Sequence, residues 1–116
     1  MTGDPTLWAA IVDRVLRFTR VSASAFAARG ANSTDAVEHA RMLADYLAAV
    51  EFDLGPAEVS RLNGRDKATV GVAINIIEDR RDDAALDAAI DAMATELRRR
   101  FPLTPPIAAN DNQVAA

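Results

Sequence analysis

Apolar residues recur every three or four positions along most of the chain, which is the spacing of amphipathic helices. Four helices are predicted from stripes of apolar residues that we expect to face the core. The stripes are Trp8, Ile11, Val12, Val15 and Phe18; Val37, Ala40, Ala44 and Leu47; Val70, Ala73 or Ile74, and Ile77; and Leu86, Ile90, Met93, Leu97 and Phe101. Two shorter helices are predicted over residues 22–29 and 56–63. Runs typical of strands are nearly absent, so the pattern predicts an all-α fold, a compact bundle of about six helices.

Residues typical of helix ends separate these stripes. Asp35, followed three residues later by Glu38, resembles a capping box and begins a helix that extends to about Val50. Phe52 and Leu54 alternate with acids in the next link and are expected to fill the small core. Beyond residue 101 a proline-containing segment has no periodicity, so we predict one domain over residues 1–101 and a disordered tail over residues 102–116.

Residues 54–77 have the outline of a helix-turn-helix. Pro56 suits the first turn of a short helix, because its missing N–H has no helical partner there. Asn63 and Gly64 end that helix, since both tolerate a positive φ. Asp66 is a good N-cap for the longer helix that follows. In this motif the start of the second helix contacts base edges in the major groove of DNA.

The start of that second helix carries side chains suited to DNA. Arg65 and Lys67 can donate to guanine or phosphate, and Asp66 can accept from cytosine N4. Arg61, on the preceding helix, suits a phosphate contact. The remaining positions are Ala68, which can contact a thymine methyl, and Thr69, which can bind phosphate or a base.

Residues 64–70 (Gly-Arg-Asp-Lys-Ala-Thr-Val) resemble the Gly-Arg-Asp-His-Thr-Thr-Val signature of the C-terminal DNA-binding domain of the bacterial replication initiator DnaA. Residues 41–47 (Arg-Met-Leu-Ala-Asp-Tyr-Leu) are similar to that family's Arg-Gln-x-Ala-x-Tyr-Leu helix. The resemblance implies the family's helical fold, double-stranded DNA as the partner, and a DNA-gripping role for Arg41. It also implies a function in replication initiation or its regulation, or in transcriptional regulation.

Two departures from the family's pattern and the overall charge support a different function. Lys67 and Ala68 replace the family's His and first Thr, and residues 30–40 contain no Lys or Arg where the family has a strongly basic loop. The chain also has 13 Lys and Arg against 17 Asp and Glu, a formal net charge of −4, whereas phosphate neutralisation supplies most non-specific DNA affinity. The alternative is therefore a protein-interaction module that keeps the fold without binding DNA, its partner being a replication protein or a second copy.

Other kinds of chemistry have little support in the sequence. The chain has one histidine, His39, and no cysteine, and it has no Gly-x-x-x-x-Gly-Lys-Ser/Thr loop for a nucleotide. Asp79, Asp82 and Asp83 match no calcium-loop spacing and suit helix capping instead. We therefore expect no enzyme activity, no cofactor and no metal. The absence of a signal peptide or a spanning apolar run favours a cytoplasmic, nucleoid-associated protein.

Overall fold

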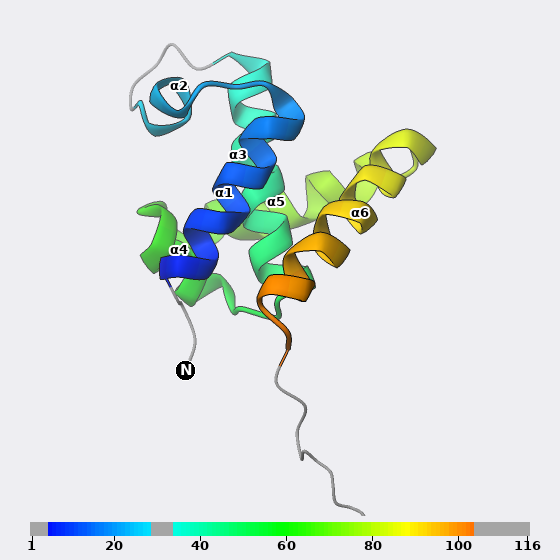
Figure 1. Cartoon of the computed structure of the whole chain (residues 1–116). Helices are drawn as coiled ribbons and strands as arrows, with labels where there is room; N and C mark the ends of the chain where they lie inside the picture. Colours follow the sequence, from blue (N-terminus) through cyan, green and yellow to red (C-terminus); the bar gives the residue numbers. More distant parts are fainter. Residues whose placement is uncertain (1–4, 29–33, 104–116) are drawn as a thin grey trace, which may run out of the picture.

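The computed structural model of the protein describes residues 5–28 and 34–103, and every regular element within those ranges is helical. In chain order (Figure 1) the elements are α1 (Pro5–Thr19), α2 (Ala23–Ala27), α3 (Asp35–Tyr46), the π-helix η1 (Leu47–Glu51), α4 (Pro56–Asn63), α5 (Lys67–Arg80) and α6 (Ala84–Arg100). The predicted all-α fold is confirmed for this part of the chain. The predicted tail lies, from residue 104 onward, outside the described residues.

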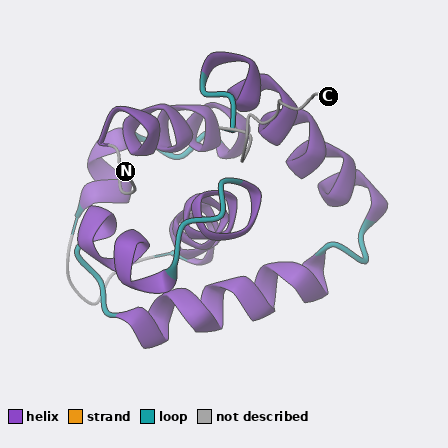
Figure 2. Cartoon of the chain, turned by 90° about the horizontal axis from the view of Figure 1, so that it is seen from below, coloured by secondary structure: helices purple, strands orange, loops and turns teal. Residues whose placement is uncertain are grey.

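α3 is the helix around which the others pack. It contacts α1, α2 and α5, while η1 contacts α1, α4 and α6, and Figure 2 shows the remaining helices arranged around a central one. The amphipathic stripes of the sequence explain this arrangement, because each helix turns its apolar side towards α3 or η1. The largest fully buried apolar side chains are Ile11, Val15, Leu43, Tyr46, Leu47, Val59, Val70, Ile77, Ile90, Met93 and Leu97.

The π-helix η1 turns the chain from α3 towards α4. The Phe52 N–H donates to the carbonyl of Leu47 at 3.1 Å, five residues back, and the Leu54 N–H donates to that of Ala48 at 3.1 Å. A π-turn adds one residue to the helical repeat and so changes which side chains face inward. Phe52 and Leu54 are both buried, which confirms that they fill the core.

The N-cap of α3 differs from the one predicted. Thr34 has an extended backbone, and its hydroxyl accepts a hydrogen bond from the Val37 N–H at 3.2 Å. Asp35 is already the first helical residue, and Glu38 binds Nη1 of Arg41 at 2.8 Å. The predicted Asp35–Glu38 capping box is therefore wrong, because the threonine one residue earlier already satisfies the free N–H groups.

The helix-turn-helix outline of α4 and α5 is confirmed. Gly64 adopts φ 75°, and its N–H donates to the carbonyl of Ser60 at 2.9 Å, which ends α4. This left-handed conformation favours glycine. Asp66 then caps α5 by accepting from the Thr69 N–H at 2.9 Å. Only residues 64–66 separate the two helices, so the turn is tight and its geometry is fixed at both ends.

Candidate nucleic-acid interface

The two sides of α5 differ sharply in their surroundings. Val70, Ala73 and Ile77 are fully buried against the core. The opposite side carries Ala68, Val72 and Asn75, all of them exposed. We call this opposite side, from Lys67 to Asn75, the outer face of α5. In DNA-binding proteins with a helix-turn-helix, the corresponding side of the second helix faces the major groove.

Two of the predicted cations are accessible beside this surface. Lys67 is exposed in the first turn of α5, and Arg61 is exposed in the last turn of α4. Neither side chain makes an ion pair or hydrogen bond with another described residue. Both can therefore contact a phosphate without breaking an existing interaction. Ala68, also predicted as a contact, is exposed next to Lys67.

Asp66 and Thr69 are bound to each other. Oδ1 of Asp66 accepts from the Thr69 N–H at 2.9 Å and lies 3.3 Å from its hydroxyl. The hydrogen bond from the Thr69 N–H is the main reason that the pKa of the Asp66 carboxyl is below its ordinary value. A carboxylate fixed in this way stabilises the start of α5. Its predicted contact with cytosine stays a prediction.

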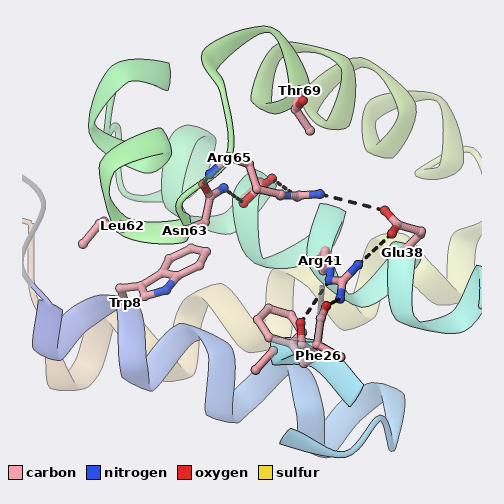
Figure 3. Close-up of a pocket in the computed structure, with 11 residues that line it drawn as sticks. Trp8, Phe26, Glu38, Arg41, Leu62, Asn63, Arg65 and Thr69 are labelled. Carbon is pink, nitrogen blue, oxygen red and sulfur yellow. Dashed lines mark hydrogen bonds and ion pairs between the residues drawn. The ribbon is translucent and has the colours of Figure 1, made fainter. Parts of the chain in front are cut away.

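Arg65 points inward, against the expectation for a base contact. Its Nη2 lies 2.5 Å from Oδ2 of Asp45, and its Nη1 lies 3.9 Å from Oε1 of Glu38. Figure 3 shows the side chain extended between Asn63 and Glu38. Only 19% of the Arg65 side chain is exposed. The arginine of the Gly-Arg-Asp segment thus holds the turn against α3 and does not project from it.

Asp45 is the buried anchor of this turn. It is 1% exposed, and its Oδ1 accepts from Nδ2 of Asn63 at 2.7 Å. Asn63 in turn accepts from the Arg65 N–H at 2.6 Å, so one carboxylate is linked to both residues that flank Gly64. Burial raises the pKa of the Asp45 carboxyl above its ordinary value, although Arg65 and Asn63 act in the opposite direction. Arg65 and Asn63 thus offset part of the cost of burying the charged form of Asp45.

Arg41 is also engaged within the chain. Its Nε donates to the carbonyl of Phe26 at 3.0 Å, and its Nη2 donates to the carbonyls of Ala28 at 2.5 Å and Ala25 at 3.3 Å. Together with Glu38, these carbonyls leave 13% of the side chain exposed. Arg41 thus satisfies the free carbonyl groups at the end of α2. The DNA-gripping role that the resemblance implies would require it to leave them.

A cavity of about 500 Å³ opens between α1, α2, α3 and the helix-turn-helix. Trp8, Phe26 and Leu62 supply its apolar wall, and Arg65 and Thr69 lie on the side of the turn (Figure 3). All five side chains are only partly buried. Trp8 is the single tryptophan of the chain, so its fluorescence reports on the packing of this turn.

The far end of α5 has the opposite charge. Glu78, Asp79 and Asp82 are exposed there, and the guanidinium of Arg81 is paired with Asp87 at 2.6 Å and with Asp91 at 2.7 Å. These acids outnumber Arg80, the exposed cation of the same turn, so the surface at the end of α5 repels anions. The acidic balance of the chain is thus concentrated away from the start of α5.

The described residues show no arrangement typical of a metal site. Within them no three His, Asp or Glu side chains are grouped to hold an ion. Nδ1 of His39 lies 2.6 Å from Nη1 of Arg80, and burial, followed by the Arg80 charge, lowers the pKa of the imidazole. No helix in this part of the chain is long and apolar enough to cross a bilayer.

Four residues important to this surface are missing from the sequence-based prediction. Asp45 and Asn63 fix the turn, while Val72 and Asn75 face outward from α5. The periodicity contains the signal for the last two, because they lie opposite the stripe of Val70, Ala73 and Ile77. For Asp45 the signal is an acid that lies between apolar residues on α3, since a buried charge needs a partner within the chain.

Comparison of the chain with protein-family models, with curated proteins and with solved structures finds no match.

Proposed function

We propose that the protein binds double-stranded DNA through α4 and α5, with the first two turns of α5 in the major groove. The observation that carries this proposal is the rigid, accessible start of α5. Its inner side is fixed by the network of Asp45, Asn63 and Arg65, while its outer face has no partner among the described residues. Lys67 at the start of that face and Arg61 beside it are exposed cations that form no ion pair with any described residue.

Each of the predicted residues has a role in this mechanism. Lys67 and Arg61 contact phosphates and orient the domain on the duplex. Ala68 lies against the base edges, and Thr69 and Asp66 hold the first turn of α5 in place. Arg65 and Arg41 act as positioning residues, because their guanidinium groups are bound within the chain. By the resemblance to the initiator family, the biological role is regulation of replication initiation or of transcription in the cytoplasm.

The charges set an expected salt dependence. Two phosphate contacts give a slope of log K against log salt of about −1.8 for a duplex, since each contributes about −0.9. Affinity then falls only about tenfold between 50 and 200 mM salt, because the fourfold change in salt is raised to that power. A domain with a basic loop would show a steeper dependence, so the slope itself tests which cations contact DNA.

The test is a fluorescence-anisotropy titration of a random duplex pool and of a DnaA-box duplex, at low and at physiological salt. We expect Lys67→Ala and Arg61→Ala each to weaken binding and to reduce the salt slope by about 0.9. Arg99→Ala, which removes one exposed cation from the last turn of α6, is the matched control and should leave both quantities unchanged. Equal losses in all three variants would mean that net charge, and not the helix-turn-helix, governs binding.

A protein-interaction function is the second candidate, and the engagement of Arg41 and Arg65 within the chain favours it. Two of the cations predicted to contact DNA, Arg41 and Arg65, are bound to carbonyls or carboxylates within the chain. Phe52 is buried, but Trp8 is partly exposed at the cavity. Absence of binding to any duplex at low salt, with a native circular-dichroism spectrum, would exclude the DNA function and favour this one.

A further inference from the structure

The outer face of α5 has a distinct chemical composition. With about 100° of rotation per residue, Ala68, Val72 and Asn75 fall within an arc of about 60° directly opposite the buried stripe. Beyond Lys67 at its start, the outer face carries neither Arg nor Lys from Ala68 to Asn75. This part of the face therefore has no cation for the bidentate contact to guanine that is the commonest base-specific contact in the major groove.

Two residues on this face are unfavourable for the isolated chain. Val72 is 56% exposed, the largest exposed fraction among the large apolar side chains of the described residues. A Cβ added at Gly71 would meet no atom within 4 Å, so packing within the described chain does not require glycine there. Glycine inside a helix is nevertheless less favourable than alanine, because it loses more backbone freedom on folding. Both features are accounted for if another molecule approaches the backbone closely at this turn.

The charges along α5 define how far such an approach extends. Lys67 stands at the start of the face, whereas the end of α5 carries Glu78, Asp79 and the exposed Arg80, followed by Asp82 and Asp83. Because acids outnumber the exposed cation at that end, a polyanion is attracted to the first half of the helix more strongly than to the second half. Val72 and Asn75 are the last outward side chains before the acids. They lie about 4.5 Å apart along the helix axis, compared with about 3.4 Å for one base step, so their side chains can reach neighbouring base pairs.

We infer that the outer face of α5 recognises adjacent A·T base pairs in the major groove, with Asn75 and Val72 as its specificity-determining residues. This inference rests on the proposed DNA-binding function. The Asn75 amide donates to adenine N7 and accepts from adenine N6, which only adenine satisfies in the major groove. Val72 and Ala68 contact the thymine methyl. Gly71, without a side chain, lets the helix backbone approach the bases.

The test compares four duplex polymers as competitors in the anisotropy assay: poly(dA-dT), poly(dA-dU), poly(dI-dC) and poly(dG-dC). Poly(dA-dU) lacks the thymine methyl. Poly(dI-dC) presents an A·T-like minor groove but a G·C-like major groove, so it separates the two grooves. The variants are Asn75→Ala and Val72→Ala, with Asn75→Asp as a control that keeps the shape but removes the donor. Because both positions are exposed, the variants are expected to fold, as circular dichroism would verify.

We expect the wild type to prefer poly(dA-dT) over poly(dI-dC) by about tenfold, and Asn75→Ala and Asn75→Asp to lose that preference. Replacing thymine by uracil should weaken wild-type binding about fourfold, the equivalent of one buried methyl. The same replacement should weaken the binding of Val72→Ala by less, because only the smaller contact through Ala68 and Ala at position 72 is left. Equal wild-type binding to poly(dA-dT) and poly(dI-dC), still dependent on Lys67, would overturn the inference and leave the proposed function intact. Binding to none of the four polymers at low salt would overturn both.

Discussion

Replacing Arg65 by alanine separates a positioning role from a DNA-contacting role. The substitution leaves the Asp45 carboxylate, 1% exposed, with only the amide of Asn63 as a partner. Breaking a buried ion pair from one side typically costs about 3–5 kcal/mol. The loss of stability has an upper limit, because Asp45 can take up a proton instead of remaining charged and unpaired. Protonating a carboxyl whose unfolded pKa is about 3.9 costs about 4 kcal/mol at pH 7.

We therefore expect Arg65→Ala to lower the free energy of unfolding by about 3 kcal/mol at pH 7. This value is at the lower end of the range for buried ion pairs, because the Arg65 side chain is partly exposed to water. The melting temperature should fall by about 12–24 °C. Urea titration followed by Trp8 fluorescence and by circular dichroism measures the change. Asp45→Asn in the Arg65→Ala background removes the stranded charge and should restore part of the loss. Arg99→Ala controls for the lost cation.

The pH dependence of the same variant gives a second measurement. The folded-state pKa of Asp45 lies above its ordinary value, so the protonated form favours the folded chain. This stabilisation is complete below the unfolded pKa and is lost as the pH rises through the folded pKa. At pH 5 the protonation ceiling is only about 1.5 kcal/mol, so the penalty of Arg65→Ala should shrink. An unchanged urea midpoint together with lost DNA binding would refute the positioning role.

Three further substitutions test other parts of the structure. Gly71→Ala should raise the free energy of unfolding, measured by thermal melting, by about 1 kcal/mol, because alanine favours the helix and its Cβ meets no neighbour. The same substitution should weaken duplex binding, measured by anisotropy, because the added methyl crowds the groove. Tyr46→Phe removes the hydroxyl that donates to Glu78 at 2.8 Å and should cost about 1 kcal/mol in urea unfolding. Arg41→Gln should cost about 2 kcal/mol and accelerate amide hydrogen exchange of the Ala28 N–H, which donates to α2.

The fold could be predicted from the sequence because helix periodicity and cap residues are local signals. Pro56, Gly64 and Asp66 define the turn without reference to the rest of the chain. The N-cap of α3 was assigned one residue too late, since Thr34 and Asp35 are both good caps and only the backbone decides between them.

The direction of the Arg65 side chain could not be predicted in the same way. Its partner Asp45 lies 20 residues upstream, on a helix whose packing against the turn is a tertiary property. The charge pattern likewise shows Arg41 and Arg65 as cations but does not show their partners, because the hydrogen bonds and the ion pair that bind them depend on how the helices pack. The outward positions Val72 and Asn75 follow from the helical period once the buried side of α5 is known.

The ion pair between Arg65 and Asp45 changes what a Gly-Arg-Asp segment means in a sequence. An arginine that holds a turn to a buried carboxylate is under selection for folding, whether or not the surface outside it still binds a ligand. A homologue could therefore lose its nucleic-acid partner and keep this tripeptide, provided that an acid remains 20 residues earlier. The residues expected to diverge with the ligand are those on the outer face. A sequence search that scores positions 68, 72 and 75 would therefore group homologues by the ligand they bind. A search that scores the Gly-Arg-Asp tripeptide would group them by fold.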